Sequence, residues 1–125
     1  GLSDKSTVLN LYLDSAGGNS SFVNFGSQKS EKVETVRLDE VLRKDQIIKL
    51  FKLDAEGYEP EVIKGAINCL KNIKFISVDF GAERGVNQES TIIQVNNLLT
   101  SNNFELVSFG EIRMTGLYKN MLINK

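Results

Sequence analysis

Alternating strand-like and helix-like segments from residue 47 onward constrain the fold of this chain more than any other feature. Runs of consecutive apolar residues are separated by stretches whose apolar residues recur at helical spacing. The segments are, in order, strand 47–53, helix 60–72, strand 75–80, helix 89–101, strand 104–109 and strand 117–123. Strands that alternate with helices pair in parallel through right-handed crossovers. The last two strands have no helix between them, so we expect them to form an antiparallel hairpin.

The residues before this core follow another pattern. Two strand-like segments, 8–13 and 33–38, flank a polar stretch over residues 14–32. Connections of that length are usually functional or mobile. Asp39 follows the second strand and suits the N-cap of a short helix.

Length and composition fit one ordinary globular unit. The chain has 125 residues, of which 41% are hydrophobic and 25% charged. This size suits one small core. We therefore expect a single domain over residues 1–125, with 1–46 as a strand-and-loop lead-in and 47–125 as the alternating core.

Composition also excludes several kinds of function. The net charge is −1 with acids and bases interspersed, which disfavours nucleic-acid binding. No apolar run reaches the roughly 18 residues that a membrane span needs. Histidine is absent, which excludes a Ser–His–Asp triad, a Cys–His pair and His-ligated zinc. The single cysteine, Cys69, cannot form an internal disulfide and fits a reducing compartment, so we expect a cytoplasmic protein. Its place beside the apolar helical stripe predicts a buried, inert thiol.

Acidic residues follow two of the predicted strands. Asp54 and Glu56 come after strand 47–53, and Asp79 ends strand 75–80. Ligands of open α/β sheets bind beyond the carboxyl ends of parallel strands, so these carboxylates could take a proton, orient a hydroxyl or bind Mg²⁺. In the alternative interpretation Asp54 caps the next helix and Glu56 complements its dipole.

Other residues near this edge have two interpretations each. Glu83 and Arg84, on the loop after Asp79, could contact a substrate or form a solvated ion pair. Lys52 could point at the edge or extend its charge into solvent. Tyr58 could line a pocket or pack on the start of the helix. The Ser20-Ser21 loop could cover a substrate.

Residues 53–59 (Leu-Asp-Ala-Glu-Gly-Tyr-Glu) and 61–66 (Glu-Val-Ile-Lys-Gly-Ala) resemble the core signature of FkbM-type methyltransferases. In that family a strand ends in Asp-x-Glu-Gly, and the next helix carries a Leu/Ile-x-Gly-Ala stretch. Further elements of the family are resembled, in the same order, by residues 2–13, 18–21, 38–42 and 120–123. The resemblance thus extends over nearly the whole chain.

The resemblance implies an S-adenosylmethionine-dependent methyltransferase that acts on a hydroxyl of a sugar or other small metabolite. It implies the C-terminal part of such a domain: a partial Rossmann-like sheet, mostly parallel, with an antiparallel C-terminal hairpin and helices on the faces. The Gly-rich turn that approaches the cofactor, and the acid that binds its ribose, are missing from the sequence. We therefore expect the isolated chain to bind the cofactor weakly or not at all, and to be inactive.

The resemblance also suggests roles for individual residues. We expect catalytic roles for Asp54, Glu56 and Asp79, and cofactor contacts from Asp54 and Ala55. The expected substrate contacts are Ser20, Ser21, Tyr58, Glu83 and Arg84. No metal site is expected under this interpretation.

Two rival functions and one structural consequence remain from the sequence. The same carboxylates could serve a Mg²⁺-dependent enzyme without S-adenosylmethionine, or the chain could be a non-catalytic α/β interaction module.

In a methyltransferase sheet, strand 47–53 would pair with a strand that this chain lacks. An apolar, unpaired edge is a template for another chain, so we expect a homo-oligomer formed through it.

Overall fold

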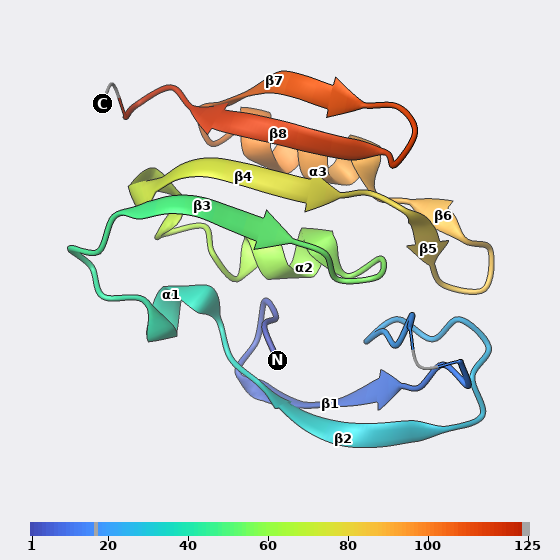
Figure 1. Ribbon diagram of the computed structural model, residues 1–125. Coiled ribbons are helices and arrows are strands. Elements are labelled where there is room, and N and C mark those ends of the chain that lie inside the picture. The colour runs from blue at the N-terminus through green and yellow to red at the C-terminus, as the bar shows by residue number, and fades with distance from the viewer. Residues whose placement is uncertain (17, 124–125) are drawn as a thin grey trace.

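The main sheet of the chain has four strands in the order β3-β4-β8-β7 (Figure 1). The computed structural model describes residues 1–16 and 18–123. The strands of this sheet are β3 (Ile48–Leu53), β4 (Ile73–Asp79), β8 (Thr115–Asn120) and β7 (Phe104–Gly110). The helical elements are α1 (Leu38–Val41), α2 (Glu59–Lys64), the 3₁₀ turn η1 (Leu70–Asn72) and α3 (Ile92–Thr100). Two small hairpins complete the chain: β1 (Thr7–Tyr12) with β2 (Ser30–Thr35), and β5 (Ala82–Arg84) with β6 (Glu89–Ser90).

The expectation of a mostly parallel, Rossmann-like sheet is wrong. Only β3 and β4 are parallel neighbours, whereas β8 runs antiparallel to both β4 and β7, so the sheet is mixed. The C-terminal hairpin forms as expected, but its returning strand lies between β4 and β7 rather than outside them. Among the described residues, helices cover one face of this sheet and not both (Figure 1).

Two contacts explain why the last strand lies beside β4. The buried amide of Asn120 donates to the backbone oxygens of Leu70 and Ile73, at 3.1 and 3.0 Å, which fixes the end of β8 to the start of β4. At the other end of the strand, a Cβ on Gly116 would lie 2.7 Å from the ring of Phe80. The absence of a side chain at Gly116 therefore lets Phe80 pack directly over β8.

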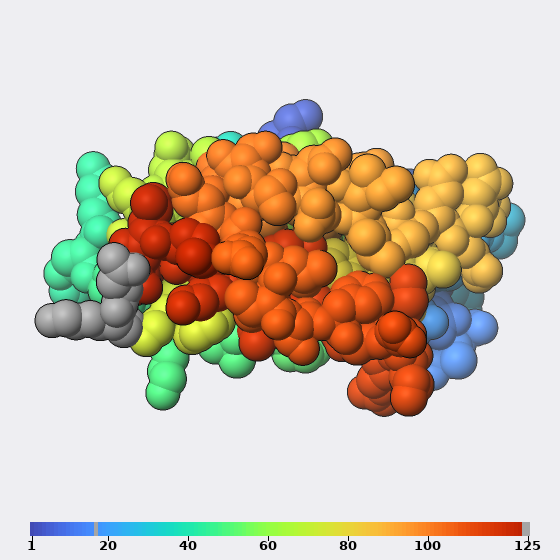
Figure 2. Space-filling view, turned by 90° about the horizontal axis from the view of Figure 1, so that it is seen from above, coloured from blue at the N-terminus to red at the C-terminus, as the bar shows by residue number. Residues whose placement is uncertain are grey.

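The core lies between the sheet and α2 with α3. Alternate residues of β3 and β4, such as Leu53, Ile76 and Val78, are buried against apolar side chains of both helices, including Ile63 and Val95. Full burial of each such side chain stabilises the fold by about 1.5–3 kcal/mol. Seen from above, α3 lies alongside the hairpin of β7 and β8, and the segment with β5 and β6 extends beyond them at one end (Figure 2). The predicted helical stripes thus do cover a sheet.

The opposite face of the sheet is open to solvent. Leu50 faces that side from β3 and is 54% exposed, and the apolar side chain of Val107 on β7 is 47% exposed. β3 is an edge strand, because within the described residues it pairs only with β4. Self-association through this edge stays a prediction. No helix among the described residues is long and apolar enough to cross a membrane.

The helix after β3 is shorter than its apolar stripe predicts. α2 ends at Lys64, and turns continue the chain to η1. The reason is the close approach of the N-terminal segment: a Cβ on Gly65 would overlap the backbone carbonyl oxygen of Ser3. Gly65 therefore allows residues near the N-terminus to pack against the end of α2.

Asp39 is not the N-cap that the sequence suggests. α1 begins one residue earlier, so Asp39 lies in its first turn. Its carboxylate accepts hydrogen bonds from the backbone N–H of Cys69 and the amide of Asn68, both at 3.0 Å, and pairs with Arg37 at 2.8 Å. Burial, and then the nearby Asp39, raise the pKa of the Cys69 thiol to about 12. The thiol is buried, as predicted, and its raised pKa keeps it protonated.

The contact at Gly65 leads to a stability prediction. Gly65→Ala should lower the free energy of unfolding by about 1–3 kcal/mol, because the new methyl group overlaps the Ser3 backbone, which cannot move as a flexible side chain does. Gly18→Ala is the matched control, since nothing lies within 4 Å of a Cβ there. Urea denaturation would measure both variants, and equal midpoints would contradict this packing.

Candidate functional site

The turn that follows β3 has an unusual backbone. Glu56 and Gly57 both adopt positive φ angles, 49° and 91°. Glycine is required at the second position, because a Cβ there would lie 2.6 Å from the Cα of Arg84. At Glu56 the left-handed conformation costs about 1–2 kcal/mol. Strain of this kind persists only where the surrounding structure enforces it, and it clusters at functional sites.

The buried carboxylate of Glu59 holds this turn in place. Only 2% of the Glu59 surface is exposed. One carboxylate oxygen accepts hydrogen bonds from the backbone N–H groups of Ala55 and Gly57, each at 3.0 Å. The other accepts from the hydroxyl of Thr91, the residue before α3, at 2.9 Å. Glu59 thus joins the turn to the start of α3. This role was not predicted from the sequence, although an acid in the first turn of a helix after a tight turn is a recognisable signal.

Arg84 clamps the other side of the turn. Its guanidinium donates to the Gly57 carbonyl oxygen at 2.6 Å and forms two hydrogen bonds with the Glu61 carboxylate, each at 2.8 Å. The neighbouring Glu61 carboxylate raises the pKa of Arg84. The ion pair is largely buried, with exposed side-chain fractions of 23% for Arg84 and 16% for Glu61. Arg84 therefore supports the turn, a role that the sequence analysis did not assign to it.

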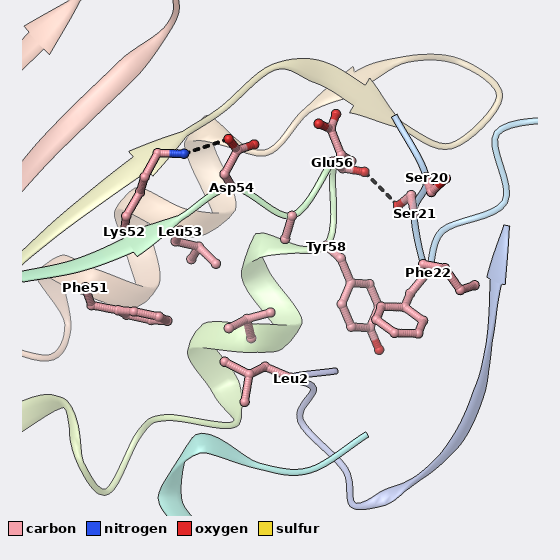
Figure 3. A pocket seen from close by; sticks show the side chains of 13 residues that line it. Leu2, Ser20, Ser21, Phe22, Phe51, Lys52, Leu53, Asp54, Glu56 and Tyr58 are labelled. Atoms are coloured by element: carbon pink, nitrogen blue, oxygen red, sulfur yellow. Dashed lines mark hydrogen bonds and ion pairs between the residues drawn. The ribbon is translucent and has the colours of Figure 1, made fainter. Parts of the chain in front are cut away.

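Asp54 and Asp79 lie at the same edge of the sheet. Leu53 of β3 is opposite Val78 of β4, so the two acids follow neighbouring positions. The Asp54 carboxylate is 40% exposed and pairs with Lys52 at 2.8 Å (Figure 3). Asp54 first, and Asp79 to a smaller extent, raise the pKa of Lys52. The juxtaposition of the two acids follows from the parallel pairing of β3 and β4.

Glu56 has the most perturbed carboxyl group at this edge. One of its carboxylate oxygens is buried and has no hydrogen-bond partner within the described part of the chain. Burial, and then the adjacent carboxyl of Glu83, raise the pKa of Glu56 to about 8. Two neighbouring carboxyl groups resist simultaneous ionisation. Glu56 can therefore exchange a proton near neutral pH.

A cavity of about 320 Å³ opens beside the turn (Figure 3). Six of the residues selected from the sequence line it: Ser20, Ser21, Asp54, Ala55, Glu56 and Tyr58. The remaining three, Asp79, Glu83 and Arg84, are not among its lining residues. The cavity thus brings the serine loop and the turn after β3 to one place.

Hydrogen bonds attach the serine loop to the turn. The Ser21 hydroxyl donates to the backbone oxygen of Glu56 at 2.7 Å and accepts from the N–H of Val23 at 3.1 Å. The Tyr58 hydroxyl is 2.9 Å from the hydroxyl of Ser3. The ring of Tyr58 also packs on Phe22, with centroids 5.3 Å apart. The serine loop is therefore held against the turn and against Tyr58.

The acids at this edge have partners of different kinds. Asp54 pairs with Lys52, and the carboxyl groups of Glu56 and Glu83 lie side by side. Within residues 1–16 and 18–123, no group of three or more Asp, Glu, His or Cys side chains is placed to hold a metal ion.

The hydrogen bonds of Glu59 lead to a graded stability prediction. Glu59→Ala removes the acceptor of two backbone N–H groups and should cost about 1–3 kcal/mol for each group left without a partner. Glu59→Gln should cost less, because its amide oxygen can still accept from Ala55 and Gly57. The exposed Glu89 provides the control Glu89→Ala. Thermal unfolding would measure the three variants. If all of them unfolded at the same temperature as the wild type, Glu59 would not hold the turn.

Comparison with known proteins assigns the chain to a family. The family model described as the methyltransferase FkbM domain matches residues 1–115. Comparisons with curated proteins and with solved structures returned no match. The matched range includes the strained turn, the serine loop and the Glu59 carboxylate. Since the match extends over more than half of the 125 residues, this chain belongs to the FkbM methyltransferase domain family.

Proposed function

We propose that the chain forms the acceptor side of an S-adenosylmethionine-dependent O-methyltransferase, which methylates a hydroxyl group of a sugar or another small metabolite. Membership of the methyltransferase family supports the reaction class. The observation that carries the proposal further is Glu56, a residue of the cavity lining whose carboxyl group has a buried oxygen without a partner among the described residues and a pKa of about 8.

Methylation of a hydroxyl requires a proton acceptor. The acceptor oxygen bonds to the methyl carbon, the bond between that carbon and the sulfonium sulfur breaks, and the hydroxyl proton leaves to a base. S-adenosylmethionine supplies the methyl group on a positively charged sulfur. A general base works best when its pKa is near the working pH, which the pKa of Glu56 satisfies. We assign the proton to Glu56, whose pKa the neighbouring carboxyl of Glu83 helps to raise.

Asp54 and Asp79 have supporting roles in this proposal. The Asp54 carboxylate lies near Glu56 and Asp54 lines the cavity, whereas Asp79 follows the neighbouring position on β4. A negative potential there favours an approaching positive charge. We accordingly propose that Asp54 and Ala55 contact the cofactor. The acceptor would contact the other side of the cavity, which is formed by Ser20, Ser21 and Tyr58.

The described residues fit the acceptor better than the whole cofactor. The two backbone N–H groups of the turn, from Ala55 and Gly57, already donate to Glu59 and cannot bind the cofactor's own carboxylate. The sequence has no Gly-rich phosphate- or cofactor-binding turn to replace them. We therefore propose that the isolated chain binds S-adenosylmethionine weakly and is inactive by itself.

The proposed base makes a prediction about activity. In the complete methyltransferase, Glu56→Gln should lower kcat about 10²–10⁴-fold, because the amide cannot accept the proton. Asp54→Asn should also lower activity while the fold is kept, since its exposed ion pair contributes at most about 1 kcal/mol. Asp45→Asn is the matched control, as Asp45 is also exposed and paired, with Arg43, away from the cavity. Wild-type turnover in both site variants would contradict the role of Glu56 as the base and the place of Asp54 in the active site.

The pKa of Glu56 makes a second prediction, which the isolated chain can test. The folded-state pKa, about 8, lies above the ordinary value of 4.5, so the folded state binds this proton more tightly. The resulting stability is present below about pH 4.5 and is lost as the pH rises through about 8. Glu56→Gln should therefore lose less stability than the wild type between about pH 6 and about pH 9, whereas Glu89→Gln should follow the wild type. Urea denaturation at the two pH values measures this, and parallel losses in all three proteins would contradict the raised pKa.

A further inference from the structure

We propose that the cavity beside the turn after β3 binds an apolar ring or a short branched apolar chain. This inference rests on the proposed function, since the bound group would be the part of the acceptor molecule that carries the reacting hydroxyl. The acceptor would then be an alcohol on an apolar framework rather than a bare sugar.

The walls of the cavity are mostly apolar. Six hydrophobic side chains from three distant parts of the sequence line it: Leu2, Leu11, Phe22, Phe51, Leu53 and Val62. Its volume of about 320 Å³ lies at the lower end of the roughly 300–1,000 Å³ range of small-molecule sites. A compact group of one ring is therefore the size of ligand that the cavity suits.

Several polar side chains of the cavity already have hydrogen-bond or ion-pair partners. The Ser21 hydroxyl bonds to the backbone on both sides, the Tyr58 hydroxyl bonds to Ser3, and Lys52 pairs with Asp54. A sugar placed here would lose its hydrogen bonds to water and find few replacements, at about 1–3 kcal/mol for each group left without a partner. An apolar ring has no such bonds to lose and gains the burial of its surface.

The arrangement of the side chains determines how a bound ring would be oriented in the cavity. The aromatic rings of Phe22 and Tyr58 lie against each other on one side, and Phe51 lies across from them (Figure 3). The carboxylates of Asp54 and Glu56 lie at the same edge, away from these rings (Figure 3). A ring held among the aromatic side chains would therefore direct a hydroxyl substituent toward the acidic edge, where the proposed base lies.

Two matched ring compounds test the proposal. Cyclohexanol and methyl α-glucoside both have six-membered rings, but only the glucoside carries several hydroxyls. We would titrate each into the isotope-labelled chain and follow backbone amide shifts by NMR. Cyclohexanol should bind roughly tenfold or more tightly than the glucoside, with the largest shifts in the segments that line the cavity.

Substitutions on β1 provide the matched variants. Leu11→Trp would fill the cavity, whereas Val8→Trp places the same side chain on the opposite, exposed face of the same strand. Cyclohexanol affinity should fall roughly tenfold in the first variant and stay unchanged in the second. Phe22→Ala, which removes an aromatic wall, is a second variant should Leu11→Trp fail to fold, and it should also weaken binding.

Three results would overturn the proposal. The first is glucoside binding as tight as that of cyclohexanol. The second is cyclohexanol binding that neither Leu11→Trp nor Phe22→Ala changes. The third is adenosine binding that is tighter than cyclohexanol binding and equally sensitive to Leu11→Trp, since the cavity would then belong to the cofactor. None of these measurements requires turnover, so failure of Glu56 as the base would leave a positive cyclohexanol result standing.

Discussion

The buried carboxylate of Glu59 is the interaction on which the site depends. It accepts from two backbone N–H groups of the turn after β3 and from the hydroxyl of Thr91 before α3. A buried charge is tolerated only when such bonds replace its hydration. Because the two helices over the sheet are joined through this one side chain, the position of the turn is fixed relative to the core. The left-handed backbone of Glu56 can then persist without relaxing.

The same turn is constrained from its other side by ionic contacts. Arg84 binds the Gly57 carbonyl and the Glu61 carboxylate, and its backbone lies so close to Gly57 that no side chain fits between them. This contact brings Glu83, the residue before Arg84, beside Glu56. The raised pKa of Glu56 therefore follows from a packing arrangement of β5 against the turn. Arg84, which clamps the turn, and Glu83, which helps to raise the pKa of Glu56, are adjacent in sequence.

Much of the architecture followed from the sequence because it depends on local patterns. The parallel pairing of β3 and β4, the helical stripes and the C-terminal hairpin correspond to periodicities that neighbouring residues create. The position of β8 between β4 and β7 did not follow. It depends on Asn120 reaching the carbonyls of Leu70 and Ile73, and on Phe80 packing over Gly116, contacts between residues roughly 36 to 50 positions apart in the sequence. Burial patterns do not distinguish a strand inserted beside β4 from one added at the edge.

The sequence by itself determined the family and the place of the acidic edge. The Asp-x-Glu-Gly turn after a buried strand, with its flanking motifs, indicated the family to which the chain belongs. Only the tertiary structure decided which groups each acid contacts. Glu56 and Glu83 are separated by 26 intervening residues, and no pattern in the sequence predicts that their carboxyl groups meet. Likewise, Glu59 and Arg84 support the turn because of long-range contacts. A pKa and a hydrogen bond depend on distance in space, which local sequence does not specify.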